Sequence, residues 1–182
     1  ILPGQPRYGG VGYRQAGVDL AQLLGTRPIA SRIATRAFAL TPAQIAHSDF
    51  NLAHLGSAQP RPFTDLRDMF RQAARILRAD MAPKYLYLYW PVLDSLGHET
   101  GVATPNSAAP RHLAAIEKAL ADFLVTAAGT RTLVLVTADH GLIDTRPQDI
   151  ISLDDHPDLA SCLALPLCGE PRAAFCYVRP GR

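Results

Sequence analysis

The sequence is poor in cysteine, and none of its cysteines has the spacing of a zinc or redox motif. Among 182 residues there are three, Cys162, Cys168 and Cys176, without a C-x-x-C pair. We expect reduced thiols in core or loop positions, and a Cys162–Cys168 disulfide is the open alternative. Unpaired cysteines favour a cytoplasmic location over an oxidising one.

The sequence also lacks long apolar runs and clusters of basic residues. No run approaches the length of about 20 residues that crosses a bilayer, and no charged-then-apolar leader opens the chain. The net charge of +2 comes from scattered arginines, which excludes an evident nucleic-acid-binding surface. We interpret Arg67, Arg71, Arg75 and Arg78 as the solvated face of one helix rather than a phosphate site.

The composition and the hydrophobic periodicity predict one α/β domain over residues 1–182. Hydrophobic residues make up 48% of the chain, enough for one sizeable core. Residues 64–77 and 110–127 carry apolar side chains at the spacing of amphipathic helices. Each helix precedes an apolar run typical of a buried parallel strand, Lys84–Trp90 and Thr132–Thr137. This alternation predicts a mainly parallel sheet flanked by helices, with the two runs as neighbouring or near-neighbouring strands.

Signals are weaker in the amino-terminal part of the chain and after Gly141. We predict a short helix over residues 16–24, a strand over 29–35 and a second short helix over 41–48, because Thr41-Pro42 resembles a helix start. Residues 51–62, rich in glycine and proline, are predicted to be a surface loop. Residues 173–178 are predicted to form a last strand.

Both predicted strands end in an acid and an imidazole. Asp94 and His98 follow the first strand four residues apart, which places them on one face of a helical turn. Asp139 and His140 follow the second strand, and Gly141 permits the backbone turn there. Ligands of open parallel sheets gather at the carboxyl ends of strands, so we expect all four side chains to converge there.

Carboxylate oxygen and imidazole nitrogen suit zinc or another first-row divalent ion. The alternative interpretation of the second pair is a loop with a solvated acid and a capping histidine. Asp154, Asp155 and His156 could add ligands, although acids at this place commonly cap a helix. His47, His54 and His112 have no acidic neighbour at chelating spacing and are expected to be surface or core residues.

The two strand-end motifs together resemble the type I phosphodiesterase/nucleotide pyrophosphatase family of the alkaline phosphatase superfamily. The resemblance rests on residues 89–91 (YWP), 94–98 (DSLGH) and 137–141 (TADHG). It implies that Asp94 and His98 ligate one divalent ion, and Asp139 and His140 another. The ions would be zinc, with manganese as an alternative, and the substrate a small phosphodiester or a nucleotide.

The family also has an early aspartate, a nucleophilic Thr or Ser and a further histidine, and none of these three residues is identifiable in this sequence. Ser95 and Thr137 do not occupy the nucleophile's place, so no catalytic residue is identifiable and the nucleophile is expected upstream of Ile1. We therefore expect an internal piece of an alkaline-phosphatase-like domain that is catalytically incomplete and inactive alone.

Other functions within the same superfamily stay open. Phosphomonoesterases, sulfatases and phosphomutases share the two-metal core. The segments that determine substrate specificity cannot be identified from this sequence. A non-catalytic fragment with a vestigial metal site is the alternative of a different class. The sequence leaves the oligomeric state open.

Overall fold

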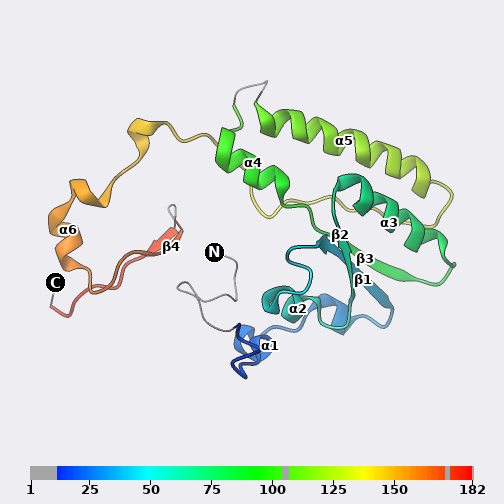
Figure 1. Ribbon diagram of the computed structural model, residues 1–182, viewed down its shortest axis with the longest axis horizontal. Helices are drawn as coiled ribbons and strands as arrows, with labels where there is room; N and C mark the ends of the chain where they lie inside the picture. The colour runs from blue at the N-terminus through cyan, green and yellow to red at the C-terminus, as the bar shows by residue number, and fades with distance from the viewer. Residues whose placement is uncertain (1–11, 104–106, 171–172, 182) are drawn as a thin grey trace. The chain divides into compact units, whose positions relative to one another are not determined.

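The computed structural model describes residues 12–103, 107–170 and 173–181 (Figure 1). The chain divides into two compact units, Ile1–Leu142 and Ile143–Arg182. The expectation of one domain over residues 1–182 stays a prediction.

The first unit contains a three-stranded parallel sheet. Its strands are β1 (Arg36–Pro42), β2 (Gln59–Phe63) and β3 (Lys84–Leu88), in the order β2-β1-β3. Helix α2 (Asp49–Leu55) connects β1 to β2, and α3 (Leu66–Arg78) connects β2 to β3. Parallel pairing requires such crossover connections. The α/β class with a parallel sheet flanked by helices is confirmed.

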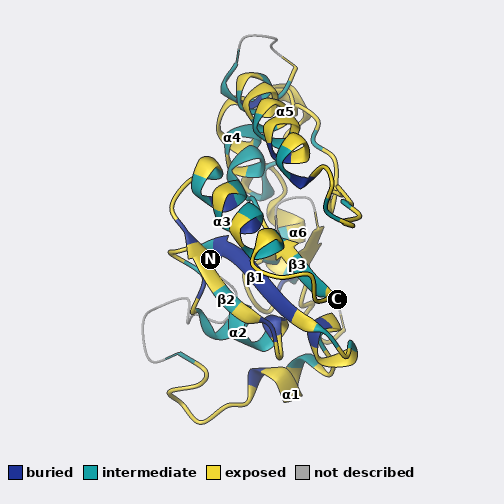
Figure 2. Ribbon diagram, turned by 90° about the vertical axis from the view of Figure 1, so that its right-hand side faces the viewer, coloured by how far each residue is buried: buried dark blue, intermediate teal, exposed yellow. Residues whose placement is uncertain are grey.

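Strand β1 is buried on both faces, as a central parallel strand must be (Figure 2). Phe38 and Leu40 belong to the core that α3 covers, with Phe63 and Met69. Ala37 and Ala39 belong to a second small cluster on the opposite face. The alternation of large and small side chains therefore builds the main core on one face and a close backbone approach on the other.

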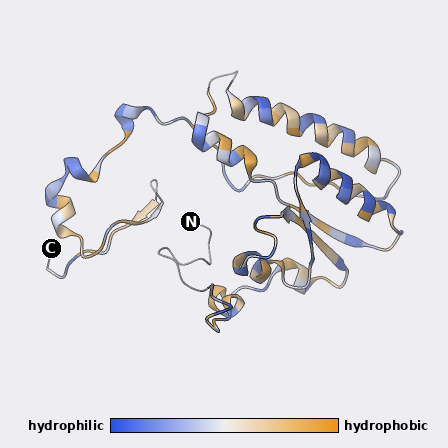
Figure 3. Ribbon diagram, in the orientation of Figure 1, coloured by the Kyte–Doolittle hydropathy of each residue, from blue (hydrophilic) through white to orange (hydrophobic). Residues whose placement is uncertain are grey.

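Helices α3 and α5 (Ala108–Ala127) pack against each other. Asp65 caps α3 by accepting a hydrogen bond from the Asp68 amide at 2.8 Å. Figure 3 shows hydrophobic and hydrophilic residues alternating along α3. The Phe70 and Phe123 rings join the two helices, with centroids 5.1 Å apart. The helical periodicity of both segments is confirmed.

The amino-terminal predictions are mostly wrong. The predicted helix over 16–24 is limited to α1 (Leu20–Leu24), and residues Ile29–Arg32 form a 3-10 turn, not a strand. Strand β1 occupies the start of the helix predicted over 41–48, and α2 and β2 occupy most of the loop predicted over 51–62. The sequence pattern did not indicate these strands, because β1 contains Ala37 and Ala39 and β2 contains Pro60 and Pro62. An edge strand tolerates proline, because its outer amides need no partner in the sheet.

The apolar run Thr132–Thr137 forms no strand ladder, contrary to the prediction. Val134 packs against the main core, but the side chains of Leu133 and Leu135 are each 82% exposed and that of Val136 is 75% exposed. β3 has a described neighbour only on its β1 side. Among the described residues, no strand therefore pairs with this run, although its sequence is apolar on both faces.

The second unit consists of short elements: η2 (Pro147–Asp149), η3 (Leu153–Asp155), α6 (Pro157–Cys162), β4 (Cys168–Glu170) and β5 (Ala173–Phe175). β4 and β5 pair antiparallel, so the strand predicted over 173–178 is present but shorter. All three thiols are free, as expected, and the cytoplasmic location stays a prediction. Within the described ranges, no helix has both the length and the hydropathy of a membrane span.

Asp80 joins the end of α3 to the amino ends of two strands. Arg36 Nη2 lies 2.6 Å from Asp80 Oδ2, and Lys84 Nζ lies 3.1 Å from Asp80 Oδ1. Hydrogen bonds from Arg36 and then Lys84 lower the pKa of Asp80 from 3.8 to about 2. Because the folded-state pKa is the lower one, the stabilisation is present above pH 3.8 and is lost as the pH falls through about 2.

We therefore predict that Asp80→Asn lowers the free energy of unfolding near neutral pH and has little effect near pH 2. Urea unfolding of both proteins at the two pH values measures the difference. Asp122→Asn, which changes a 75% exposed side chain on α5, is the matched control and should have little effect at either pH. An equal loss at both pH values for Asp80→Asn would contradict the electrostatic origin.

Candidate functional site

Helix α4 (Val92–Thr100) begins directly after β3 and carries the first acid–imidazole pair. The four-residue spacing places Asp94 and His98 on the same side of this helix, with His98 Nε2 3.4 Å from Asp94 Oδ1. α4 packs against α5, which fixes its direction relative to the sheet. The first pair therefore lies beyond the carboxyl end of β3, where the sequence predicted it.

The second pair lies in the bend that follows residues 132–137. The His140 amide donates to Asp139 Oδ1 at 3.1 Å, and His140 Nδ1 lies 3.0 Å from the Gly141 carbonyl oxygen. A carbonyl oxygen only accepts, so this contact requires the proton on Nδ1. His140 Nε2 then faces the acids, 3.7 Å from Asp139 Oδ2 and 3.8 Å from Asp94 Oδ1.

The structure brings the two pairs together, since Asp94 contacts both imidazoles. A glycine in α4 allows this approach, because a Cβ atom on Gly97 would lie 2.6 Å from Leu142 Cδ1. Gly97 lies between Asp94 and His98, and Leu142 follows His140 closely in the chain. A larger side chain at Gly97 would require the Leu142 side chain to shift.

One oxygen of this cluster is buried without a hydrogen bond. Asp94 Oδ1 has no hydrogen-bond partner, although the Asp94 side chain as a whole is 47% exposed. A buried carboxylate oxygen without a hydrogen-bond partner is costly, and binding of a cation is one way to compensate it. The Nε2 atoms of His98 and His140 lie 3.4 Å and 3.8 Å from this oxygen. Carboxylate oxygen and imidazole nitrogen are donor types that divalent cations accept.

Two tyrosines of β3 and its extension lie near the acids. The rings of Tyr87 and Tyr89 stack with centroids 6.4 Å apart. Burial raises the pKa of Tyr89, and the Asp139 and Asp94 carboxylates raise it further. Burial, Tyr89 and Tyr85 raise the pKa of Tyr87, and Asp139 adds to this effect. Both phenols therefore stay protonated and can donate hydrogen bonds at the site.

The sequence did not single out these tyrosines as site residues. Their signal was the alternation of Tyr85, Tyr87 and Tyr89, which places the three rings on one face of a strand. Aromatic residues at this spacing occur in many strands. The folded chain brings Asp139 close to Tyr87 and Tyr89, and this proximity connects the two phenols with the site.

The four side chains are not arranged as a complete metal centre. Within the described parts of the chain, no three or more histidine, cysteine or acidic side chains form a group able to hold a metal ion. Each separation of 3.4–3.8 Å joins one imidazole nitrogen to one carboxylate oxygen. The Ser95 and Thr137 hydroxyls donate to the Pro91 and Ala138 carbonyl oxygens, and this geometry assigns neither as a nucleophile.

The additional candidate ligands Asp154, Asp155 and His156 lie in the second unit. His156 stands at the amino end of α6 without a capping hydrogen bond from its side chain. The acids Asp154 and Asp155 belong to η3, where the Ser152 side chain makes the capping hydrogen bond. The proposed capping role of these acids at α6 is therefore absent from the described contacts.

Comparison with known proteins identifies one family. The family model described as type I phosphodiesterase / nucleotide pyrophosphatase matches residues 13–179. This match includes both acid–imidazole pairs and most of the second unit. No curated protein and no solved structure gives a significant match.

Trp90 anchors the start of α4 to α5. Its indole Nε1 donates to His112 Nε2 at 2.9 Å, and the two rings lie 5.7 Å apart between centroids. We predict that His112→Phe, which keeps an aromatic ring but removes the acceptor, lowers the free energy of unfolding by about 1–3 kcal/mol. Urea unfolding followed by the fluorescence of the single tryptophan measures this loss.

His47→Phe is the matched control, because His47 is exposed. It should change neither the unfolding free energy nor the emission maximum by a comparable amount. Equal effects of the two substitutions would show that the indole hydrogen bond contributes nothing specific.

Proposed function

Because the chain belongs to the type I phosphodiesterase/nucleotide pyrophosphatase family, we propose that its acid–imidazole cluster binds divalent metal for the hydrolysis of phosphodiester or pyrophosphate bonds. Asp94, His98, Asp139 and His140 hold two divalent ions, zinc or alternatively manganese. The substrate is a small phosphodiester or a nucleotide. The proposal extends the family assignment to a defined set of residues and a defined chemistry.

The observation that carries the proposal is the buried Asp94 Oδ1, which has no hydrogen-bond partner and faces two imidazoles. His140 supports the same conclusion, because its proton lies on Nδ1 and its Nε2 is directed toward two carboxylates. Two carboxylates that face the same nitrogen repel each other, and a positive charge between them lowers this repulsion. A metal ion supplies this charge for both acids at once.

The chain's own groups would then orient the substrate. Bound divalent ions supply positive charge for phosphoryl oxygens and for the entering and leaving oxygens. Tyr87 and Tyr89 add neutral phenol donors beside Asp139, and their raised pKa keeps them protonated in the neutral range. Such donors can hydrogen-bond to a phosphate oxygen without adding charge.

We predict that metal-free protein binds zinc and that Asp94→Asn weakens binding at least about tenfold, since loss of an outer-shell partner alone costs about 10–100-fold. Isothermal titration calorimetry with zinc measures both affinity and stoichiometry. Asp122→Asn, which changes an exposed acid on α5, is the control and should bind like the original protein. If the unaltered chain binds no zinc, or if both variants bind equally, the metal site is wrong.

Hydrolysis is assayed with bis(4-nitrophenyl) phosphate, with and without zinc or manganese. Two protein donors per ion and the absence of an assigned nucleophile predict slow turnover by this chain. Metal-dependent turnover that Asp139→Asn abolishes would support the hydrolase and show that the chain supplies its own nucleophile. Preference for 4-nitrophenyl phosphate or a sulfate ester would favour the phosphomonoesterase or sulfatase alternatives, and zinc binding without turnover a non-catalytic module.

A further inference from the structure

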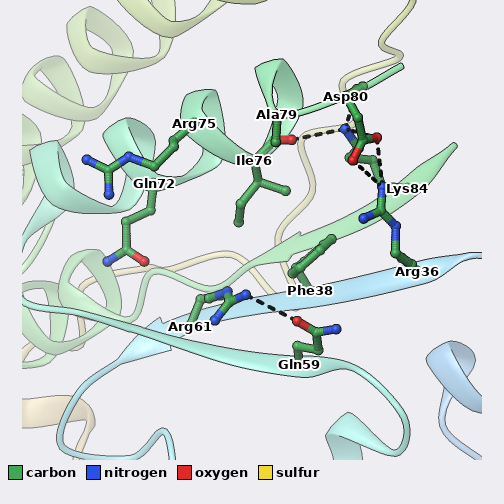
Figure 4. A pocket seen from close by; sticks show the side chains of 10 residues that line it. All are labelled: Arg36, Phe38, Gln59, Arg61, Gln72, Arg75, Ile76, Ala79, Asp80 and Lys84. Atoms are coloured by element: carbon green, nitrogen blue, oxygen red, sulfur yellow. Dashed lines mark hydrogen bonds and ion pairs between the residues drawn. The ribbon is translucent and has the colours of Figure 1, made fainter. Parts of the chain in front are cut away.

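A second site candidate lies at the opposite edge of the sheet from the acid–imidazole cluster. A groove of about 470 Å³ opens between the sheet and the second half of α3 (Figure 4). Arg36, Gln59 and Lys84, the first residues of β1, β2 and β3, all line it. The groove thus lies at the amino ends of the strands, whereas Asp94 and His98 follow the carboxyl end of β3.

The groove has a surplus of positive charge. Four cationic side chains line it, Arg36, Arg61, Arg75 and Lys84, against the single carboxylate of Asp80. Asp80 already forms ion pairs with Arg36 and Lys84. Lys84 Nζ also donates to three carbonyl oxygens at the end of α3, so its role is largely structural. Arg61 and Arg75 therefore remain as the cations available to a ligand.

Arg61 is held in place on β2, and Arg75 on α3 lines the same groove. Arg61 Nη2 donates to Gln59 Oε1 at 3.1 Å, and its guanidinium lies 5.5 Å from the centroid of the Phe38 ring. These contacts use one of its five N–H donors and orient the others. No hydrogen bond or ion pair of Arg75 is present among residues 12–103, 107–170 and 173–181. Figure 4 shows Arg61 on β2 and Arg75 on α3.

Two other arginines of α3 have partners within the protein. Arg71 Nη2 pairs with Asp68 at 2.6 Å, and Arg78 Nη2 donates to the Thr126 carbonyl oxygen at 3.1 Å. All four arginines that the sequence interpretation places on a solvated face are exposed, and Arg75 also lines the groove. The side chain of Ile76 and the buried Phe38 give this groove an apolar wall.

We propose that this groove binds a small phosphomonoester through Arg61 and Arg75, with the body of the ester against Ile76 and Phe38. A phosphomonoester carries a charge of about −1.5 to −2 at neutral pH, which matches a surplus of three cations better than the single charge of a carboxylate. Guanidinium groups bind phosphate oxygens in bidentate geometry. The volume lies within the range of about 300–1,000 Å³ typical of small-molecule sites, which leaves room for the ester body.

The test uses metal-free protein in excess EDTA, where the acid–imidazole cluster is negative and repels phosphate. Phenyl phosphate is the probe, and isothermal titration calorimetry measures its binding. We expect a Kd of about 1 mM or below, with at least about a tenfold increase for Arg61→Gln and for Arg75→Gln. Arg67→Gln removes the same charge from an α3 position outside the groove and should change the Kd by less than about twofold.

Additional titrations distinguish phosphate esters from other anions, and the groove from the acid–imidazole cluster. Inorganic phosphate should bind more weakly than phenyl phosphate, because it lacks the ester body, and benzoate should bind at least about tenfold more weakly. Asp94→Asn should not weaken binding of phenyl phosphate in EDTA, so failure of the metal proposal leaves this result unaffected. Circular dichroism verifies that each variant is folded.

Several results would overturn the proposal. No detectable binding of phenyl phosphate would do so, as would an equal loss of affinity in Arg67→Gln and Arg75→Gln, which indicates a diffuse charge effect. Benzoate binding as tightly as phenyl phosphate would refute the phosphate preference.

Discussion

Strand β1 forms parallel hydrogen-bonded ladders with both β2 and β3, and the rest of the first unit depends on this double pairing. Its alternating side chains place Phe38 and Leu40 under α3, and Ala37 and Ala39 under the opposite face. Because all three strands run the same way, their amino ends share one edge and their carboxyl ends the other. The sheet thus separates the cationic groove from the acid–imidazole cluster.

The acid–imidazole cluster depends on two segments that different interactions hold in place. Trp90 binds His112 on α5, and this contact fixes the start of the helix that carries Asp94 and His98. Gly97 then permits Leu142 to approach, which brings His140 to Asp94. Packing between segments distant in the chain thus positions these side chains.

The run Thr132–Thr137 is apolar on both faces but forms no strand in the described structure. Its composition suits burial on both faces, yet Leu133 and Leu135 are each 82% exposed because no described strand pairs with this run. Val134 still packs against the core, and the turn that follows still delivers Asp139 and His140. Asp139 and His140 come close to α4 although the predicted ladder is absent, so the contact of His140 with Asp94 does not require it.

The sequence by itself determined the α/β class, the long helices α3 and α5, strand β3 and the family, because these features depend on local periodicity and on short motifs at fixed spacing. It did not reveal β1 or β2, since an alanine-rich strand and an edge strand with two prolines become recognisable only through their partners. The tertiary structure alone decided that Asp94 contacts both imidazoles, that Tyr87 and Tyr89 lie beside Asp139, and that Arg75 lines a groove. Each of these depends on contacts between segments distant in the chain, and local sequence patterns carry no information about such distances.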